Sequence, residues 1–222
     1  MMYYDSYRFA VKYDTLRRYR KDEPELIDYL DDLCPLRGLR IAEFGCGTGA
    51  LTEALAKKAE WVDGFDRSSA MLSKAQKNMQ RKSIKNCRLS LADHRAVPLE
   101  SGTADLAVAA WTMVCIAQET AESEWRSTVA DMTSEMIRVV RPGGTIAVVA
   151  PVPSGNRRNY TAYLEERFGF QARYFQTSWY FMSRRRARNV IRFFLGDSVW
   201  KAYRHTWPRP YVQNAGIWWL LV

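Results

Sequence analysis

The feature that most constrains the fold is a short apolar run that ends in three alternating glycines. Leu39–Phe44 has the length and composition of a buried strand. It is followed by Gly45, Gly47 and Gly49, and a helical pattern begins directly after them. Glycines at such a turn let the backbone reverse sharply and let a ligand approach without meeting Cβ atoms. The segment therefore predicts a strand, a ligand-binding turn and a helix; a turn that serves only to reverse the chain is the alternative.

Apolar runs and helical patterns alternate along the next hundred residues. Four further buried strands are predicted, at Trp61–Phe65, Cys87–Ala92, Ala104–Ala110 and Thr145–Ala150. A Ser-capped helix follows the second strand, and a long amphipathic helix precedes the fifth. This alternation of helices with near-continuous apolar strands is typical of a parallel sheet covered by helices on both faces. We therefore predict an α/β fold, and 222 residues fit one domain.

The two ends of the chain flank this core. Two helices are predicted within the opening thirty residues, and the last third contains an aromatic strand, short helices and a closing strand, Gly216–Val222. The short helices before that strand are rich in aromatic residues, which favours a helical lid that keeps water out of a site. We expect a helical cap over residues 1–35, a core over 36–150 and a substrate-side region over 151–222, all within a single domain.

Positive charge is concentrated in the last third. Residues 151–222 contain 12 Lys and Arg against 3 Asp and Glu, whereas residues 1–150 contain 21 of each, so the net charge of +9 belongs entirely to the C-terminal region. Its densest run is Arg184–Arg188. This run is either the exposed start of a helix or a site for a carboxylate, a phosphate or a nucleic-acid backbone.

Acidic residues follow the second and third strands. Asp66 is placed where a carboxylate accepts hydrogen bonds from both hydroxyls of a ribose, and its alternative role is to cap the next helix. Asp93 is placed to accept a hydrogen bond from an adenine amino group, and its alternative is a surface turn. Arg141–Gly144 predicts a tight turn before the fifth strand.

In this order and spacing, these motifs resemble the class I S-adenosylmethionine-dependent methyltransferases of the small-molecule type. The resemblance covers residues 36–150 and rests on Glu43–Gly49, Asp66, Ala92-Asp93 and Arg141–Gly144. It implies a Rossmann-like, mostly parallel sheet of seven strands whose last strand is reversed, with S-adenosyl-L-methionine as the cofactor. The spacing G-x-G-x-G differs from the G-x-G-x-x-G of dinucleotide-binding folds, which disfavours a nicotinamide-dependent dehydrogenase.

The resemblance also implies roles for individual residues. Glu43 would steady the glycine turn and the amino group of the cofactor, the backbone of Gly45–Gly49 would line the methionine portion, and Asp66 would hold the ribose. Tyr13 is assigned to closure over the methionine end, where it would also take part in catalysis. The other residues assigned to cofactor binding are Phe44, Cys46, Arg67, Met71, Ala92, Asp93, His94 and Trp111.

Methyl transfer needs alignment of the acceptor more than it needs a dedicated catalytic group. If a general base is used, His205 is the better candidate of the two histidines, because His94 is expected beside the cofactor. A structural role is the alternative for both. No cluster of residues has metal-ligand spacing, so no metal is expected.

The basic C-terminal region favours a small-molecule or short-peptide acceptor that carries an anionic group. Methylation of RNA or another macromolecule is an alternative, but the motif of base-amino methyltransferases is replaced here by Ala109–Thr112. A non-catalytic scaffold that binds the cofactor is a further alternative. The N-terminal sequence is unlike a signal peptide, no apolar run reaches the length of a membrane span, and the four cysteines form no close pair. These features predict a cytoplasmic location without a membrane partner, and they leave the oligomeric state open.

Overall fold

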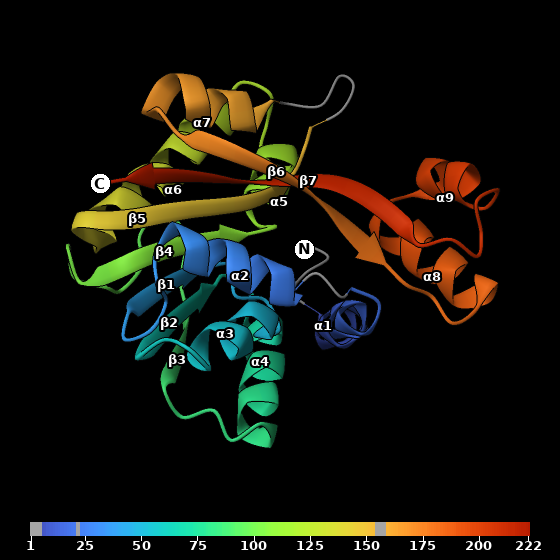
Figure 1. Ribbon diagram of the computed structural model, residues 1–222, viewed down its shortest axis with the longest axis horizontal. Coiled ribbons are helices and arrows are strands. Elements are labelled where there is room, and N and C mark those ends of the chain that lie inside the picture. Colours follow the sequence, from blue (N-terminus) through green and yellow to red (C-terminus); the bar gives the residue numbers. More distant parts are fainter. Residues whose placement is uncertain (1–5, 21–22, 154–158) are drawn as a thin grey trace.

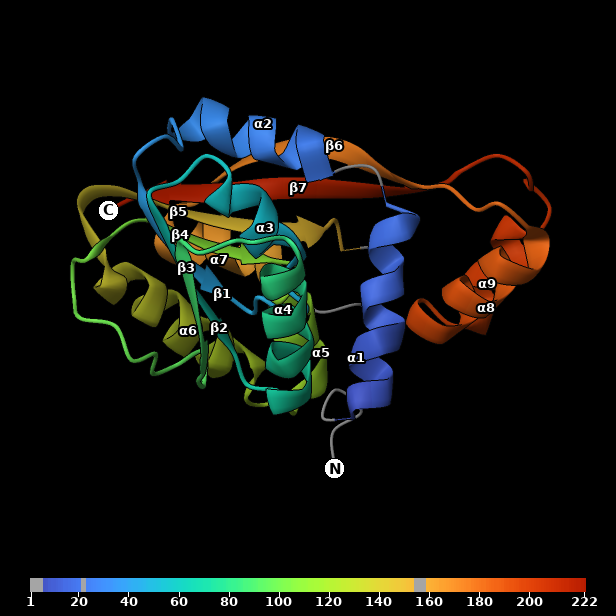
Figure 2. The ribbon, with the colours of Figure 1, turned by 90° about the horizontal axis from the view of Figure 1, so that it is seen from below.

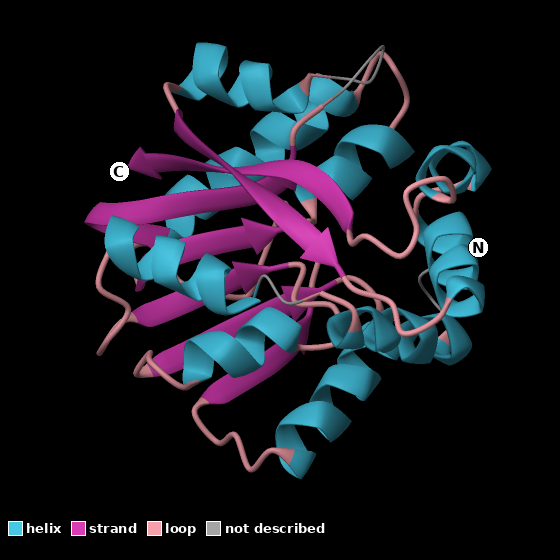
Figure 3. Cartoon of the chain, turned by 45° about the vertical axis from the view of Figure 1, so that its right-hand side comes forward, coloured by secondary structure: helices cyan, strands magenta, loops and turns pink. Residues whose placement is uncertain are grey.

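The computed structural model describes residues 6–20, 23–153 and 159–222. One seven-stranded sheet forms its centre, in the order β3-β2-β1-β4-β5-β7-β6, with helices on both faces (Figures 1 and 3). The strands are β1 Arg40–Phe44, β2 Trp61–Asp66, β3 Cys87–Leu91, β4 Ala104–Ala110, β5 Val140–Pro151, β6 Gln171–Trp179 and β7 Tyr211–Leu221. Strand β7 alone runs antiparallel to its neighbours β5 and β6. The predicted α/β sheet with a reversed last strand is confirmed.

Alternating side chains along the central strands build two separate cores. On one face, β1 and β4 residues such as Ile41 and Leu106 pack against α2 (Glu23–Leu33) and α3 (Ala50–Ala56). On the other face, Ala42 and Ala107 pack against α5 (Met113–Glu119), α6 (Trp125–Val139) and α7 (Tyr160–Phe168). This arrangement follows from the period of two in a strand, because strands buried on both faces need apolar residues at every position.

Of the remaining helices, all but one lie beyond the carboxyl ends of the parallel strands; the exception packs along the outer strands β2 and β3. Helix α4 (Ser69–Arg81) packs against α1 (Tyr7–Asp14), and a 3₁₀ turn, η2 (Thr15–Arg18), follows α1. Helices α8 (Arg184–Phe194) and α9 (Asp197–Tyr203) are inserted between β6 and β7, as the sequence predicts for a helical insertion. Figure 2 shows α1 between the core and these two helices.

Strands β6 and β7 continue beyond the end of β5 as a two-stranded ribbon. Their pairing runs from Gln171↔Trp219 to Trp179↔Tyr211, whereas β7 pairs with β5 only as far as Ala215. The ribbon ends in α8 and α9, which pack on each other through a small aromatic core of their own. We call the outer ribbon with these helices the extension; it projects to the right in Figure 1.

The structure corrects the turn predicted at Arg141–Gly144. Strand β5 already begins at Val140, and its register with β4 jumps from Ala104↔Val140 to Leu106↔Thr145. Four residues therefore lie opposite a single β4 residue, which is a bulge within a strand. A hydrogen bond to the residue after β7 stabilises the bulge: the Gly143 N–H donates to the carbonyl oxygen of Val222.

Helix α5 is not predicted from the sequence. Its apolar residues continue the composition of β4 with only Thr112 between them, so Leu106–Ala117 reads as one run. The helix begins after Trp111, a residue with a φ of +62° that ends the extended backbone. Within the described residues, every helix is too short or too polar to span a bilayer.

Candidate functional site

The glycine turn after β1 has a backbone conformation that few other residues adopt. Gly45 and Gly47 have φ angles of +79° and +53°. A Cβ atom on Gly45 would lie 2.1 Å from Thr112 Oγ1, whereas the nearest atom to one on Gly47 would be a ring carbon of Tyr13, at 3.6 Å. The Gly45 N–H donates to the Phe65 carbonyl oxygen over 2.8 Å, which ties the turn to β2. Packing therefore requires glycine at position 45, and Gly47 presents bare backbone beneath Tyr13.

Asp66 joins this turn to the start of α4. Its Oδ2 accepts a hydrogen bond from the Gly47 N–H over 2.8 Å, and its Oδ1 accepts one from the Ser68 N–H over 2.9 Å. Ser68 is the N-cap of α4, as the sequence predicts, and its hydroxyl accepts from the Met71 N–H. A carboxylate offers about four acceptor positions. Asp66 therefore keeps capacity for further donors while it fixes the loop.

Glu43 lies on β1 and is only 2% exposed. Its Oε2 accepts a hydrogen bond from the Thr52 hydroxyl over 2.6 Å. Burial raises the pKa of Glu43 to about 7; the Thr52 hydrogen bond opposes this rise, and the nearby charge of Asp66 adds to it. The carboxyl group is therefore divided between its two protonation states near neutral pH. A cationic group beside it would favour the charged form.

His94 is buried, with 7% of its surface exposed, and lies just beyond β3. Its Nδ1 has no hydrogen-bond partner among the described residues. Burial lowers the pKa of His94, although the charge of Asp66 opposes the change, so the ring is neutral at physiological pH. A buried polar atom without a partner costs about 1–3 kcal/mol. A ligand with a polar edge at this position would supply the missing partner.

Two small cavities flank the glycine turn. The Asp66 cavity, of about 110 Å³, is also lined by His94. The Glu43 cavity, of about 70 Å³, lies on the other side of the turn. The residues that line both are Tyr13, Gly45, Gly47, Ala110 and Trp111.

Tyr13 reaches these cavities from α1. Its ring stacks with Phe9 at 6.3 Å and meets Phe194 of α8 edge-on at 6.0 Å between ring centres. Burial raises the pKa of Tyr13 to about 12. The phenol therefore stays protonated through the neutral range, so it is suited to covering a ligand or donating a hydrogen bond and not to removing a proton.

Trp111 forms the wall between the two cavities in an uncommon backbone conformation. Its φ of +62° is strained for a bulky residue. Its N–H donates to the Val149 carbonyl oxygen over 2.7 Å, and the guanidinium of Arg20 lies 4.2 Å from the centre of its ring. Hydrogen bonding and a cation–π contact thus hold Trp111 at the end of β4.

A third cavity, of about 450 Å³, lies between α5, α7 and the extension. We call it the Gln118 cavity. It is separate from the Asp66 cavity, but Phe194 lines it and also contacts Tyr13. None of the described residues that line it is charged. They are Val114, Gln118, Pro151, Val152, Pro153, Tyr160, Phe194, Leu195, Val199, Tyr211, Val212, Gln213 and Asn214.

The structure brings most of the residues assigned to cofactor binding together around the glycine turn. Those that line one or both small cavities are Tyr13, Glu43, Gly45, Cys46, Gly47, Asp66, Arg67, Met71, His94 and Trp111. Phe44 is instead buried in the sheet core, and Gly49 lies against Ala75 and Met79 of α4. These two residues support the glycine turn without lining either cavity.

Ala92 and Asp93 do not line either small cavity. Asp93 is exposed and forms a two-pronged ion pair with the Arg95 guanidinium, at 2.9 and 2.8 Å. Arg95 holds the pKa of Asp93 down at about 2. Asp93 therefore lies in a surface turn, the alternative to an adenine contact. The next residue, His94, is the one that lines the Asp66 cavity.

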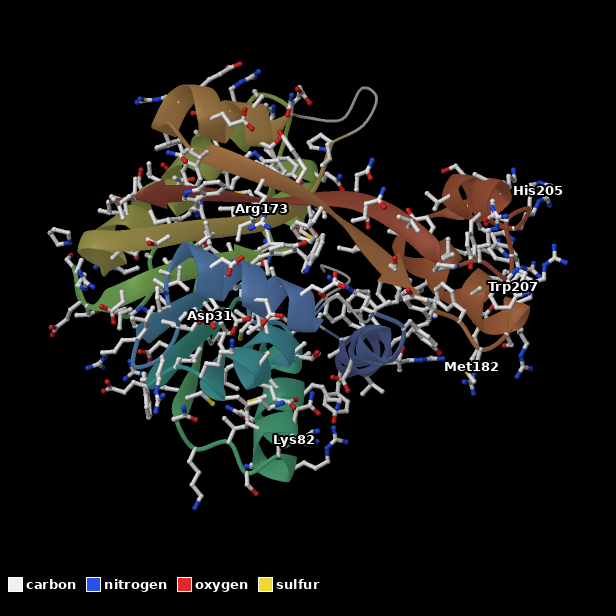
Figure 4. All side chains as sticks on the ribbon, in the orientation of Figure 1. Asp31, Lys82, Arg173, Met182, His205 and Trp207 are labelled. Carbon is white, nitrogen blue, oxygen red and sulfur yellow. The ribbon has the colours of Figure 1, made fainter. Side chains whose placement is uncertain are left out.

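His205 is not brought to the cavities. It lies exposed in the turn after α9, at the outer end of the extension (Figure 4). Its Nε2 accepts a hydrogen bond from Arg204 Nε over 3.1 Å. The position does not support the prediction of a general base, because such a base must reach the proton that it removes.

Sequence reasoning missed the cavity residues supplied by η2, α2 and α5. They include Leu16, Leu26, Cys115, Ile116 and Glu119, and Arg20 just after η2 was missed as well. An available signal was the position of Thr112–Glu119 directly after the fourth strand, where open α/β sheets bind their ligands. Glu119 also forms an ion pair with Arg67 across the Asp66 cavity.

Comparisons with known proteins agree with this geometry. A protein-family model described as "Methyltransferase domain" matches residues 41–144. Ubiquinone biosynthesis O-methyltransferase of Paracidovorax citrulli is 27% identical over 133 residues, which are 55% of this chain and 48% of that protein. Malonyl-[acyl-carrier protein] O-methyltransferase of Salmonella typhimurium is 29% identical over 107 residues, 48% of this chain and 37% of that protein. The chain thus spans at most about half the length of these two relatives.

Solved structures share the fold at low sequence identity. A SAM-dependent methyltransferase of Aquifex aeolicus superposes with a TM-score of 0.61 at 14% identity, over 98% of this chain and 99% of that one. An N-methyltransferase of Haemonchus contortus, in complex with phosphomonomethylethanolamine and S-adenosylhomocysteine, gives a TM-score of 0.62 at 14% identity, over 100% of this chain and 61% of that one.

Proposed function

We propose that this chain, whose residues 41–144 match a methyltransferase domain, is a class I S-adenosylmethionine-dependent methyltransferase that transfers a methyl group to a small, uncharged acceptor molecule. The observation that carries the proposal is the group of Gly47, Asp66 and the unpartnered Nδ1 of His94 around one cavity. When bound, S-adenosylmethionine supplies a methyl group that its sulfonium already makes electrophilic. The protein then has to hold the two reactants in line and exclude water.

We assign the parts of the cofactor by the chemistry of the residues. Asp66 accepts hydrogen bonds from the ribose hydroxyls, and His94 offers its Nδ1 to the polar edge of adenine. Glu43 faces the methionine end, where a cationic amino group favours the ionised form of this buried carboxyl. Tyr13 covers that end as a protonated phenol.

Cofactor binding requires a side chain to move. The Asp66 and Glu43 cavities have volumes of about 110 and 70 Å³, whereas pockets for ligands of this size usually exceed about 300 Å³. Tyr13 and Trp111 line both cavities. Tyr13 comes from α1 and not from the sheet, so it can swing aside to admit the cofactor and then return against Phe194 to cover the methionine end.

The Gln118 cavity is the best candidate for the acceptor. Its neutral amides, together with the apolar rings beside them, suit a molecule with an apolar body and a hydrogen-bonding group. The anionic acceptor predicted from the Arg184–Arg188 run gains no support, because this cavity has no charged residue in its described lining. The relatives are named O-methyltransferases, and transfer to an acceptor oxygen, with the hydroxyl proton released to solvent, is in keeping with those names.

The first test is calorimetric titration of the protein with S-adenosylhomocysteine beside NAD. We expect a dissociation constant in the micromolar range, about −8 kcal/mol, for the former and no binding of the latter. Binding of NAD alone, or of neither ligand, would contradict the proposal.

The acceptor assignment is tested separately. Purified protein is incubated with radiolabelled S-adenosylmethionine and a panel of neutral and anionic phenols and acids, and transfer of label is measured. Gln118→Ala should raise KM for the acceptor found without changing the affinity for S-adenosylhomocysteine, while Gln80→Ala on the exposed side of α4 should change neither. Preference for anionic acceptors, or equal effects of the two substitutions, would remove the Gln118 cavity from the proposal.

A further inference from the structure

The extension contains a groove that none of the assigned roles uses. It lies between α8 and α9, has a volume of about 670 Å³ and is lined by Arg184, Arg185, Arg188, Asn189, Arg192, Asp197, Trp200, Lys201 and Arg204. No residue of this groove lines the Asp66, Glu43 or Gln118 cavities. We call it the arginine groove.

Six of its nine lining residues are cations and one is an acid. The acid, Asp197, is already engaged by an ion pair with Arg192. Arg192 lowers the pKa of Asp197 most, and the charges of Lys201 and Arg188 lower it further, as expected in a strongly positive field. The N-terminus of α8, where Arg184 lies, adds the positive end of the helix dipole. So many like charges in one groove repel each other, and an anion would relieve this repulsion.

The spacing of the cations fits a chain of anions better than a single ion. Arg184, Arg188 and Arg192 recur at intervals of four residues, so they form one row on α8 about 12 Å long. Lys201 of α9 and Arg204, which directly follows that helix, lie on the facing wall. The row on α8, with Lys201 and Arg204 facing it, accommodates consecutive phosphates within reach of its guanidinium groups.

The shape of the groove distinguishes between polyanions. A narrow chain can enter a concave groove and contact the cations on its walls. The flat surface of a lipid bilayer contacts only the rim of the groove. Trp200 is the one aromatic residue in the lining and is 8% exposed, so it offers little surface on which a base can stack. The chemistry of the groove is therefore directed at a phosphate backbone and not at bases.

From these observations we infer that the arginine groove binds the phosphodiester backbone of a single-stranded nucleic acid, without sequence preference. The site goes beyond the proposed function, because it shares no residue with the methyl-transfer cavities. It gives a role to the C-terminal excess of positive charge that the acceptor cavity does not explain.

The test measures fluorescence anisotropy of a labelled oligouridylate of about 12 nucleotides on titration with the full chain. Two double variants each remove two charges, Arg185→Gln with Arg188→Gln on α8 and Lys201→Gln with Arg204→Gln on α9. Each pair should weaken binding roughly tenfold, and should reduce the slope of log K against log[salt] by about 1.4, at about 0.7 for each phosphate that the variant no longer neutralises. These side chains are exposed, so the fold should be retained.

The matched control removes the same charge elsewhere. Arg126 on α6 and Arg167 on α7 are exposed, and each stacks on an aromatic ring at the core end of the molecule. Arg126→Gln with Arg167→Gln should leave affinity for the oligouridylate and the salt slope almost unchanged. S-adenosylhomocysteine binding, measured on all three variants, reports the integrity of the core.

Several outcomes would overturn the inference. The first is absence of oligouridylate binding at low salt, and the second is an equal loss in the control and groove variants. The third is binding of an oligoglutamate of equal length as tightly as the oligouridylate, which would indicate an acidic protein partner. The fourth is preferential binding to vesicles of phosphatidylglycerol and phosphatidylcholine, which would indicate a membrane surface.

Discussion

The glycine-turn region and the extension handle charge in opposite ways. Around the turn, Glu43, Asp66 and His94 are buried, and each is held by a specific partner or shifted in pKa by its surroundings. In the extension, the cations of the arginine groove are exposed and outnumber the acids that face them. The first region is built for a ligand of fixed shape, and the second for a ligand defined mainly by its charge.

The two regions also differ in how the fold supports them. The glycine turn lies at the carboxyl ends of strands β1, β2 and β4, which are buried in the centre of the sheet. The extension is attached through a two-stranded ribbon and has a separate aromatic core. A substitution in the turn should therefore affect both folding and cofactor binding, whereas one on the outer surface of the extension should affect neither of these.

The largest expected effect comes from adding a methyl group at a glycine in each region. Gly45→Ala places a Cβ atom 2.1 Å from Thr112 Oγ1 at a φ of +79°. Overpacking and left-handed strain together cost roughly 2–4 kcal/mol. Gly196, between α8 and α9, has a φ of +94° with no atom within 4 Å of an added Cβ, so Gly196→Ala should cost only the strain. Denaturant unfolding of both variants measures the difference, and equal losses would mean that the glycine turn is no more tightly packed than the extension.

The second effect is on the pH dependence of stability. Folded Glu43 keeps its proton up to about pH 7, whereas its ordinary pKa is 4.5. Between these values the folded state binds more protons than the unfolded state, so the contribution of Glu43 to stability falls as pH rises. The total change is on the order of 3 kcal/mol. Glu43→Gln keeps an acceptor for Thr52 and should remove this fall.

For an acid in the extension, Asp197, we expect the opposite dependence of stability on pH. The pKa of Asp197 is lowered, chiefly by Arg192, so its contribution to stability is lost as pH falls towards the acid range. Asp197→Asn should therefore leave the slope of the unfolding free energy against pH unchanged between pH 5 and 7. The measurement is urea unfolding across pH 4 to 8. A wild-type curve parallel to that of Glu43→Gln would show that Glu43 has an ordinary pKa.

The third effect separates two acids for which the sequence predicts similar roles. Asp66→Ala should weaken binding of S-adenosylhomocysteine by about 1–3 kcal/mol, the cost of losing charged hydrogen bonds. Asp93→Ala should leave it unchanged, because Asp93 is exposed and paired with Arg95. Asp66→Asn controls for the loop, since its remaining oxygen still accepts one backbone hydrogen bond. Calorimetry that finds equal losses for Asp66→Ala and Asp93→Ala would restore Asp93 to the adenine site.

Features encoded by neighbouring residues were predictable from the sequence. The strands, the Ser68 cap and the glycine turn depend on local periodicity and on residues a few positions apart. Asp66 was predictable for the same reason, because the end of a strand fixes its place. Helix α5 was not, since only Thr112 interrupts the apolar run that joins it to β4.

Features that depend on side-chain conformation or on contacts distant in sequence were not predictable. The pairing of Asp93 with Arg95 in a turn, which directs His94 towards the cavity, depends on side-chain conformations that no periodicity encodes. The position of His205 depends on the direction of the β6–β7 ribbon, which carries it away from the glycine turn. The groove itself requires α8 and α9 to face each other, so the sequence revealed its charge but not its shape.

The smallest expected effect is at the contact between the two regions. Phe194 of α8 packs edge-on against Tyr13, which covers the Asp66 and Glu43 cavities. An aromatic pair of this geometry contributes about 0.5–1.5 kcal/mol, so Phe194→Leu should weaken S-adenosylhomocysteine binding by roughly twofold to tenfold. Phe181→Leu, which removes a ring packed on Tyr19 and Tyr203 instead, serves as the control and should change the affinity little. Equal affinities for Phe194→Leu and the wild type would mean that the extension does not help to hold Tyr13 over the site, and that the two regions act independently.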